Sequence, residues 1–434
     1  MTSRTATQPT QKSAHGSQTG LVWTTTSNGH APTTPYLDGH FFHNIARRWP
    51  TCPVIDPNGH YMNEMEIAEL EDMGTYDTAQ DLFTQQLRFT FTPLAGWNIV
   101  ADGAMRNSTA KTAYSMTPVY YYDVNDEPFI RNSDYGTTSY VYDGYSRQNY
   151  YALNIFTDYT RSFGLNNFKV LVGMNYELYK NDALYGYGEN LTNPDKIFIN
   201  QAQDGFETSD TYNHRSTAGY FGRLNYGYDG RYMLEANIRY DGSSRFLANR
   251  RWKWFPSFSA GWNIAKEAFF HENISKISTL KLRASWGQLG NTSSEYNSFW
   301  DWYPFYQQQS FGANNSAWLV NGAQMNTASL PAIINGLMTW ETIESWNIGL
   351  DFAALNNRLT GSFDWFTRTT KDMIGPAMIM GGVLGTDAPR TNNCDMRTSG
   401  WEFEIGWRDR IGKVSYEARF NISDNTSKIL SYPY

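Results

Sequence analysis

Long apolar runs are missing from this chain of 434 residues, and no stretch approaches the 18 apolar residues that indicate a transmembrane helix. Only 41% of the residues are hydrophobic. These absences exclude a membrane protein built of helices. They leave a transmembrane β-barrel open, because half of each barrel strand faces a polar interior and lowers the average hydropathy.

Cysteine and basic charge are also scarce. The two cysteines, Cys52 and Cys394, lie far apart and outside any metal-ligand spacing, so a disulfide and two free thiols both stay open. The formal net charge is −7 and no long basic run occurs, which argues against nucleic acid as a partner. We expect no cofactor and no metal.

The first residues lack the apolar segment of a secretory signal peptide. Because they are polar and low in complexity, we expect residues 1–34 to be a disordered leader, or an artefact of where the reading frame was opened. A protein of the outer membrane needs a signal peptide, so the true amino terminus is expected further upstream.

Alternating strand patterns are what the chain has in abundance. The clearest is Tyr220–Asp241, in which Asp229-Gly230 separates two alternating runs and predicts a tight hairpin turn. One face of this hairpin carries tyrosine and aliphatic residues, and the opposite face carries charged and amide residues. Similar runs from Gln85 to Phe420 predict about twelve strands in six hairpins.

Tight turns and long loops alternate along these predicted strands. The sections 180–215 and 287–340, for example, are expected to be loops. Outer-membrane barrels have short periplasmic turns, long extracellular loops and strands of about ten residues, whereas such loops are uncommon inside a compact soluble domain. We therefore predict an all-β fold, an antiparallel transmembrane β-barrel segment without a plug domain.

Outward aromatic side chains are predicted near the strand ends, as expected for the aromatic girdles at the two membrane interfaces. The alternative is that aromatic residues are simply good strand formers. The residues concerned are Tyr228, Tyr232, Tyr240, Trp262, Trp286, Trp346, Trp401 and Trp407.

Several blocks of the sequence resemble one family. The blocks GYFGRLNYGYDGRYMLEANIRYDGSSRF, WFPSFSAGWNIAKEAFF, LKLRASWGQLGN, WNIGLDFAALNNRLTGSFDWF and GWEFEIGWRDRIG occur in this order. Together they are similar to the SusC/RagA-like TonB-dependent outer-membrane transporters, and the resemblance extends upstream to about Tyr36.

The resemblance implies a barrel of about 22 strands closed by an amino-terminal plug. It also implies import of oligosaccharides or peptides across the Gram-negative outer membrane, energy relayed by TonB, and a SusD-like lipoprotein over the extracellular mouth. No plug, TonB-contacting segment or signal peptide is recognised, and about ten strands are not accounted for. We therefore interpret residues 35–434 as a partial barrel, an internal fragment of a transporter.

Catalysis has little support in the sequence. Glu402 and Glu404 share one strand face at about 7 Å, a separation that inverting glycosidases use, but a solvated barrel wall explains them better. Asp123, Asn125, Asp126 and Glu127 faintly resemble a calcium loop, but the spacing lacks the central glycine and the terminal glutamate of such a loop. We therefore expect a protein that is not an enzyme.

Binding residues are expected on two surfaces. Charged and amide side chains of the strands should face the lumen: Arg223, Glu235, Asn237, Arg239, Asp351, Asp364, Glu402, Arg408, Glu417 and Arg419. Loop aromatics are candidates for stacking on substrate or for docking the lid, because specificity tends to lie on loops over a rigid scaffold: Trp252, Trp302, Tyr303, Phe305 and Trp318.

The predicted function is that of an outer-membrane nutrient importer, in contact with lipid, a SusD-like lipoprotein and TonB. Two alternatives stay open. A passive porin would share the barrel, and a soluble aromatic-rich glycan-binding or glycan-cleaving β-protein would share the composition.

Overall fold

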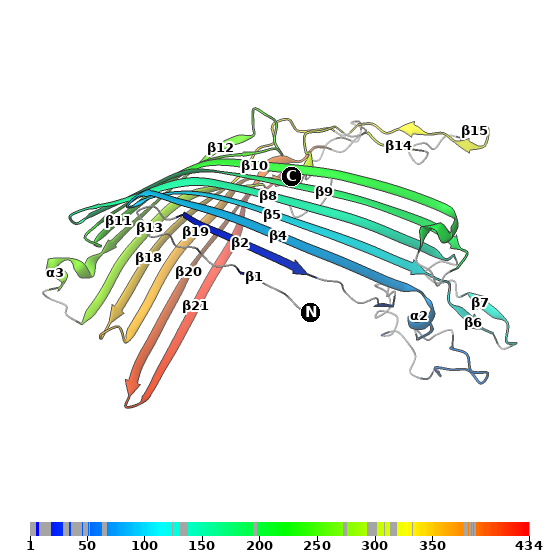
Figure 1. The fold of residues 1–434 in the computed structure, drawn as a ribbon, viewed down its shortest axis with the longest axis horizontal. Coiled ribbons are helices and arrows are strands. Elements are labelled where there is room, and N and C mark those ends of the chain that lie inside the picture. Colours follow the sequence, from blue (N-terminus) through cyan, green and yellow to red (C-terminus); the bar gives the residue numbers. More distant parts are fainter. Residues whose placement is uncertain are drawn as a thin grey trace.

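One curved antiparallel sheet forms most of the structure, a computed structural model (Figure 1). It describes residues 6–7, 19–28, 34–35, 46, 51, 53–62, 67–123, 125–130, 138–193, 198–271, 276–292, 302–307, 309–312, 319–331, 333–376, 381, 383, 385 and 388–433. The sheet contains 15 strands, and neighbours in the sheet follow one another along the chain. The predicted all-β class is confirmed.

Twelve long strands make up the body of the sheet. They are β4 (Thr75–Leu94), β5 (Trp97–Met116), β8 (Tyr140–Phe163), β9 (Asn166–Leu191), β10 (Ala202–Tyr228), β11 (Tyr232–Ser243), β12 (Trp252–Asn263), β13 (Ile277–Asn291), β18 (Glu341–Ala354), β19 (Leu359–Gly375), β20 (Thr391–Ile411) and β21 (Val414–Ser431).

Short elements lie at the edge of the sheet and in the connections. The amino-terminal edge carries β1 (Ala6–Thr7), β2 (Thr19–Asn28) and β3 (Thr34–Pro35). The connections hold β6 (Tyr120–Tyr122), β7 (Pro128–Ile130), β14 (Phe311–Gly312), β15 (Leu319–Val320), β16 (Ala323–Gln324) and β17 (Thr327–Ala328). The helices among the described residues are α2 (Ile67–Asp72), α3 (Ala268–His271), η1 (Ile199–Gln201) and η2 (Ile264–Lys266).

Tight turns lie at one end of the sheet, which we call the turn end. Asp229 and Gly230 both have positive φ, 53° and 61°, as a two-residue type I′ hairpin turn requires. Asn356 and Asn357 also have positive φ, 58° and 61°. The predicted turns are confirmed, and the opposite end, with the longer connections, is the loop end.

Strands β5, β8, β9 and β10 have 20, 24, 26 and 27 residues and are much longer than the strands of about ten residues that are typical of outer-membrane barrels. The prediction of a loop over 180–215 was wrong, because β9 runs to Leu191 and β10, with 27 residues, begins at Ala202. Polar residues on both faces hid the strand pattern there. On the outer face of this extension, ion pairs replace the apolar side chains, with Lys111 Nζ 3.3 Å from Asp143 and Arg147 3.1 Å from Asp182.

Part of the expected disordered leader is strand in the structure. Residues Thr19–Asn28 form β2, which pairs with β4 in a register that sets Thr24 opposite Gln86. Backbone pairing adds this segment to the sheet, so the expectation for residues 1–34 does not describe it. The remaining leader residues mostly lie outside the described part of the chain.

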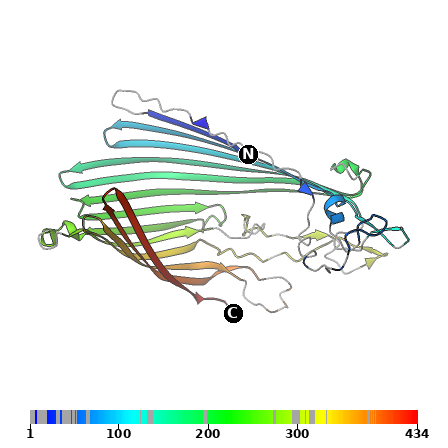
Figure 2. The same ribbon diagram turned by 90° about the horizontal axis from the view of Figure 1, so that it is seen from below.

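The sheet is open among the described residues. Strands β1 and β21 stand at the two ends of the strand order, and no described strand joins them (Figure 2). Hydrophobic clusters are small and lie at the loop end. One joins α2 to β5 through Ala68, Met73 and Met116, and the other contains Phe246, Phe255 and Trp340.

Candidate functional site

The polar face of the sheet is the candidate functional surface. On hairpin β10–β11, Arg223 lies opposite Asn237 and Asn225 lies opposite Glu235. Arg223 Nε donates to Asn237 Oδ1 at 2.6 Å, and Asn237 Nδ2 donates to Glu235 Oε1 at 2.8 Å. Asn225 Nδ2 also donates to Glu235 Oε2, so the four side chains form one hydrogen-bonded group on the face opposite Tyr220 and Leu234.

A second polar group spans three strands. Arg283 of β13 donates to both oxygens of Asp351 on β18, at 2.8 Å each, and to Asp364 Oδ2 on β19 at 3.0 Å. A planar guanidinium suits such forked contacts. The register also sets Glu402 of β20 opposite Asp364, which places this carboxylate on the same face.

Three arginines converge on a polar hollow of about 550 Å³ on this face. Arg88, Arg223 and Arg239 line it. Arg88 pairs with Asp102, and Arg239 Nη2 contacts Asp241 Oδ1 at 2.8 Å and Asn175 Oδ1 at 3.0 Å. The hollow thus presents charge-balanced arginines rather than a bare cationic surface.

All ten side chains predicted for the lumen lie on this one face. Arg408 lies opposite Glu417, and Arg419 lies opposite Gly406, in register with the residues above. Eight of the ten, all except Glu402 and Arg408, have side-chain hydrogen bonds or ion pairs with neighbouring described residues of this face. A direct role of any of them in holding a ligand stays a prediction.

A ladder of tyrosines crosses the loop end of the same face. Tyr76, Tyr114 and Tyr142 lie opposite one another on β4, β5 and β8. Neighbouring ring centroids are 5.9 Å apart from Tyr76 to Tyr114 and 4.8 Å from Tyr114 to Tyr142, with interplanar angles of 17° and 11°. Tyr142 stacks in turn on Tyr185 of β9 at 5.3 Å.

Glycine makes room within this tyrosine ladder. A Cβ at Gly144 would lie 2.7 Å from the ring of Tyr142, so the ring leans over Gly144 toward Tyr185. Beside it, Tyr140 packs on Tyr187 at 5.4 Å, and Tyr187 Oη donates to Glu189 Oε1 at 2.9 Å. The tyrosine ladder, defined as Tyr76, Tyr114, Tyr142 and Tyr185, is therefore part of a larger aromatic surface.

Burial and neighbouring groups keep these phenols neutral. Burial raises the pKa of Tyr142, and the nearby Tyr185 and Tyr76 add to the increase. Burial also raises the pKa of Tyr187, assisted by its hydrogen bond to Glu189. Because an unperturbed tyrosine already titrates near pH 10, both phenols stay protonated throughout the physiological range.

A second aromatic row lies closer to the middle of the sheet. Arg106, Tyr150, Tyr179 and Arg215 lie opposite one another on β5, β8, β9 and β10. The guanidinium of Arg106 lies 5.4 Å from the ring centre of Tyr150, and that of Arg215 lies 5.4 Å from Tyr179. These are cation–π distances.

One predicted loop aromatic completes this second row. Trp302 stacks on Tyr179 at 5.4 Å with an interplanar angle of 21°, and Arg215 lies 5.3 Å from its ring centre. The neighbouring Tyr303 accepts a hydrogen bond from the backbone N–H of His214 at 3.0 Å. Segment 302–306 therefore covers β10 where that strand has run past its partner β11.

The other predicted loop aromatics have different positions. Trp252 is the first residue of β12 rather than a loop residue, and its ring packs at 5.0 Å on Tyr240 and at 6.1 Å on Tyr220, on the apolar face. Phe305 packs at 4.7 Å on Tyr306. Trp318 lies outside the described residues.

The tyrosine ladder was not predicted from the sequence. Tyr185 lies in the section 180–215, which we interpreted as loop. Strand register brings the ladder together: Tyr76, Tyr114 and Tyr142 lie opposite one another, and Tyr142 contacts Tyr185 diagonally, because Tyr185 lies opposite Gly144. The alternation of Tyr140 with Tyr142, and of Tyr185 with Tyr187, was the pattern that could have indicated strands there.

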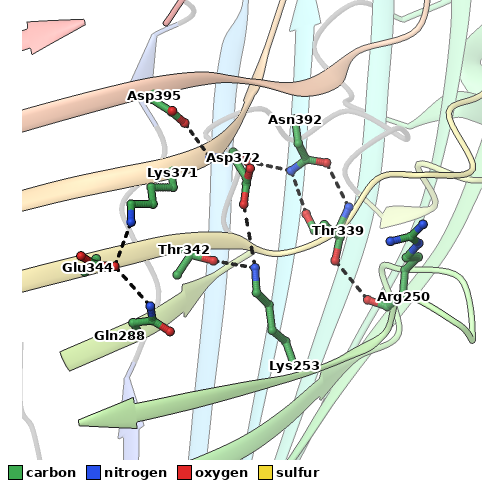
Figure 3. A network of polar contacts seen from close by, with 10 residues as sticks. All are labelled: Arg250, Lys253, Gln288, Thr339, Thr342, Glu344, Lys371, Asp372, Asn392 and Asp395. Carbon is green, nitrogen blue, oxygen red and sulfur yellow. Dashed lines mark hydrogen bonds and ion pairs between the residues drawn. The ribbon is translucent and has the colours of Figure 1, made fainter. Parts of the chain in front are cut away.

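A polar network ties the loop end together (Figure 3). Lys253 Nζ donates to Thr342 Oγ1 at 2.7 Å, and Lys371 Nζ lies 2.9 Å from Glu344 Oε2. Asn392 Nδ2 donates to the carbonyl oxygens of Thr339 and Asp372 at 2.9 and 2.7 Å. Strands β12, β18, β19 and β20 are thereby connected at this end.

Metal and thiol chemistry find no site in the described part of the chain. Asp123 Oδ1 accepts the backbone N–H groups of Asn125 and Glu127 at 2.8 and 2.9 Å, which is a local turn. No group of three or more His, Cys, Asp or Glu side chains is arranged to hold a metal ion among the described residues. Cys394 is a buried free thiol, and Cys52 lies outside the described residues.

Comparison with known proteins places the chain in a family. The family model described as TonB dependent receptor-like, beta-barrel matches residues 10–433. The chain belongs to this family. It is 32% identical over 300 residues to the TonB-dependent receptor SusC of Bacteroides thetaiotaomicron, an alignment that covers 68% of the chain and 29% of SusC.

Other relatives agree with this assignment. The TonB-dependent receptor P3 of Formosa agariphila is 30% identical over 279 residues, which cover 63% of the chain and 27% of P3. The fold matches the structure of the RagAB peptide transporter with a TM-score of 0.75 at 20% identity, over 97% of the chain and 46% of that protein's chain. The chain thus spans less than a third of these curated relatives and about half of the solved one.

Membership of this family confirms the predicted SusC/RagA-like resemblance. No described helix is long and apolar enough to cross a membrane. TonB-dependent receptor barrels are proteins of the Gram-negative outer membrane, and the family is one of receptors and transporters.

Proposed function

We propose that this chain is part of the barrel wall of an outer-membrane importer that takes up oligosaccharides or peptides. The observation that carries the proposal is the two-sided sheet, whose polar face bears the tyrosine ladder at the loop end. In a barrel of this family the polar face lines the lumen, the turn end is periplasmic and the loop end is extracellular. A solute arriving from outside would therefore meet the tyrosine ladder first.

The chemistry of the tyrosine ladder suits such a solute. Stacked rings project from the sheet and present edges and hydroxyl groups, which can contact the apolar and the polar parts of a sugar or a peptide. The Arg106 and Arg215 row below it adds cationic groups and the ring of Trp302. No step in this scheme makes or breaks a covalent bond.

Partners follow from the same proposal. A SusD-like lipoprotein would cover the extracellular mouth, and TonB would supply energy through a plug region. Trp302, Tyr303, Phe305 and Trp318 are proposed to contact substrate or lid, whereas the placement of Trp252 fits the membrane interface. The ten polar wall residues are proposed to line the path or to hold the plug.

Uptake in the native organism tests the proposal. A strain lacking the intact gene is compared with wild type on a panel of purified glycans and peptide mixtures, which identifies the nutrient. Tyr114→Ala combined with Tyr142→Ala should raise the concentration for half-maximal uptake by about 10-fold, since each lost aromatic contact is worth roughly 0.5–1.5 kcal/mol.

Tyr145→Ala is the matched control, because Tyr145 is on the same strand but on the opposite face, half exposed to the outside. Equal uptake defects in the ladder and control variants would contradict a ligand-binding role. Uptake that persists after depletion of TonB would favour the passive porin, and recovery of the intact protein in the soluble fraction would favour the soluble β-protein.

A further inference from the structure

The apolar face of the sheet contains a hollow of about 840 Å³ that the importer function does not use. Its floor is formed by Ala236, Ala260 and Ala284, on the neighbouring strands β11, β12 and β13. The stacked rings of Phe258 and Trp286 stand on one side, with centroids 6.0 Å apart. The volume falls within the range of small-molecule pockets.

Strand register explains why the hollow exists. Ala260 lies opposite Ala284 on the next strand. Phe258 lies opposite Trp286, two residues nearer the loop end along each strand. Two methyl groups therefore stand beside a wall of rings, and Ala236 continues the floor next to Phe258. Since alternate residues point to opposite faces, all these side chains share the apolar face.

Apolar side chains make up most of the described lining of the hollow, and the hydroxyl group of Tyr226 in this lining is used within the protein, where it donates to Asn166 Oδ1 at 2.8 Å. Glu235 and Ser259 border it only through the strand backbone, because their side chains point to the other face, where Glu235 is held by Asn237. A protein partner would find no charged side chain to recognise among the described residues on this face of the hollow. The lining suits a hydrocarbon chain, which needs only apolar contact.

Tryptophan and tyrosine side chains at two heights along the strands indicate how deep in the membrane the hollow lies. Trp262, two residues from Ala260 toward the turn end, donates through Nε1 to Glu267 Oε1 at 2.9 Å, and Tyr232 donates to the same oxygen at 2.6 Å. Toward the loop end, Trp254 stacks on Tyr240 at 4.4 Å. Tryptophan and tyrosine rings at two such levels are typical of the two membrane interfaces, so the hollow lies in the leaflet of the turn end.

We propose that this hollow holds an acyl chain of a phospholipid from the periplasmic leaflet. The proposal rests on the membrane placement given under the proposed function. The acyl chain fills the depression over the three alanines and packs against the rings of Phe258 and Trp286, so that no void is left beside them. The headgroup of the phospholipid stays at the level of Trp262. The hollow is thus a specific lipid site within a generally apolar surface.

Native mass spectrometry of the intact protein, purified from outer membranes and exchanged into mild detergent, tests this proposal. Wild-type protein should retain about one phospholipid per molecule. Ala260→Leu with Ala284→Leu fills the floor of the hollow and should reduce the retained phospholipid at least about 5-fold. Ala101→Leu is the control, because it makes one substitution of the same kind on the apolar face of β5, away from the hollow and opposite Phe89 and Ile155.

Three results would overturn the lipid site: no retained phospholipid on the wild type, equal retention in the filled variant, or an equal loss in the Ala101→Leu control. If the double variant does not fold, Ala284→Val should lower retention in part, and unchanged retention counts against the site. Recovery of the protein outside the outer membrane would instead refute the proposed function. The two failures are therefore distinguishable.

Discussion

At the scale of single residues, Arg283 shows how the polar face is held together. Its guanidinium joins β13 to β18 and β19, through Asp351 and Asp364. Without it, two carboxylates would face each other across one strand pair. Arg283 and Asp351 are each about one-third exposed, so solvent screens part of the interaction.

Replacing Arg283 by methionine should lower the free energy of unfolding by about 1–2 kcal/mol, because both aspartates lose their common donor. Urea titration of the intact protein in detergent measures the change. Adding Asp364→Asn to the Arg283→Met variant should recover part of the loss by removing one of the two like charges. If the double variant is as unstable as the sum of the two single variants, the three side chains do not act as a unit.

At the scale of elements, the β10–β11 hairpin carries the contrast between lipid and lumen. Ile238 lies opposite Pro256 on the apolar face, and the next residue pair, Asn237 and Ser257, lies on the polar face. The turn at Asp229-Gly230 sets this register, and a shift of one residue would exchange the two faces. Substitutions on this hairpin and on the adjacent strand β12 can therefore test which face of the sheet contacts lipid.

Ile238→Lys should destabilise the folded protein in lipid by roughly 2–4 kcal/mol if the residue lies near the bilayer midplane. Ser257→Lys on the adjacent strand should be tolerated, since its side chain reaches the polar face. Urea unfolding in lipid vesicles, followed by tryptophan fluorescence, measures both variants. Equal penalties at the two positions would refute the assignment of faces.

At the scale of the whole molecule, strand order is decided by pairing between distant segments. Strand β2 adds to the edge of β4 although more than forty residues lie between them. The polar sequence of residues 1–34 predicts nothing of this kind. Backbone hydrogen bonds to an available sheet edge supply the pairing instead.

A cysteine pair tests this edge. In a protein with Cys52→Ser and Cys394→Ser, the combination Thr24→Cys and Gln86→Cys should form a disulfide under mild oxidation, because these residues lie directly opposite each other. Thr24→Cys with Leu87→Cys should not, since Leu87 points to the other face. Gel mobility with and without reductant reports both results. Equal cross-linking of the two pairs would contradict the register.

Local patterns in the sequence predict much of the fold. Asp229-Gly230 and Asn356-Asn357 mark turns because few other residues accept positive φ, and alternation assigns Arg223 and Asn237 to one face. These are properties of neighbours along the chain, and the structure confirms them. The same reasoning failed over 180–215, where polar residues on both faces leave no alternation to read.

By itself, the sequence determined the strands of the apolar band, the turns between them and the division into a polar and an apolar face. Only the tertiary structure decided which residues meet: the tyrosine ladder across four strands, Trp302 on Tyr179, and the three alanines beneath Phe258 and Trp286. The physical reason is that alternation depends on adjacent residues, whereas these contacts depend on register and on a connection that returns across the sheet.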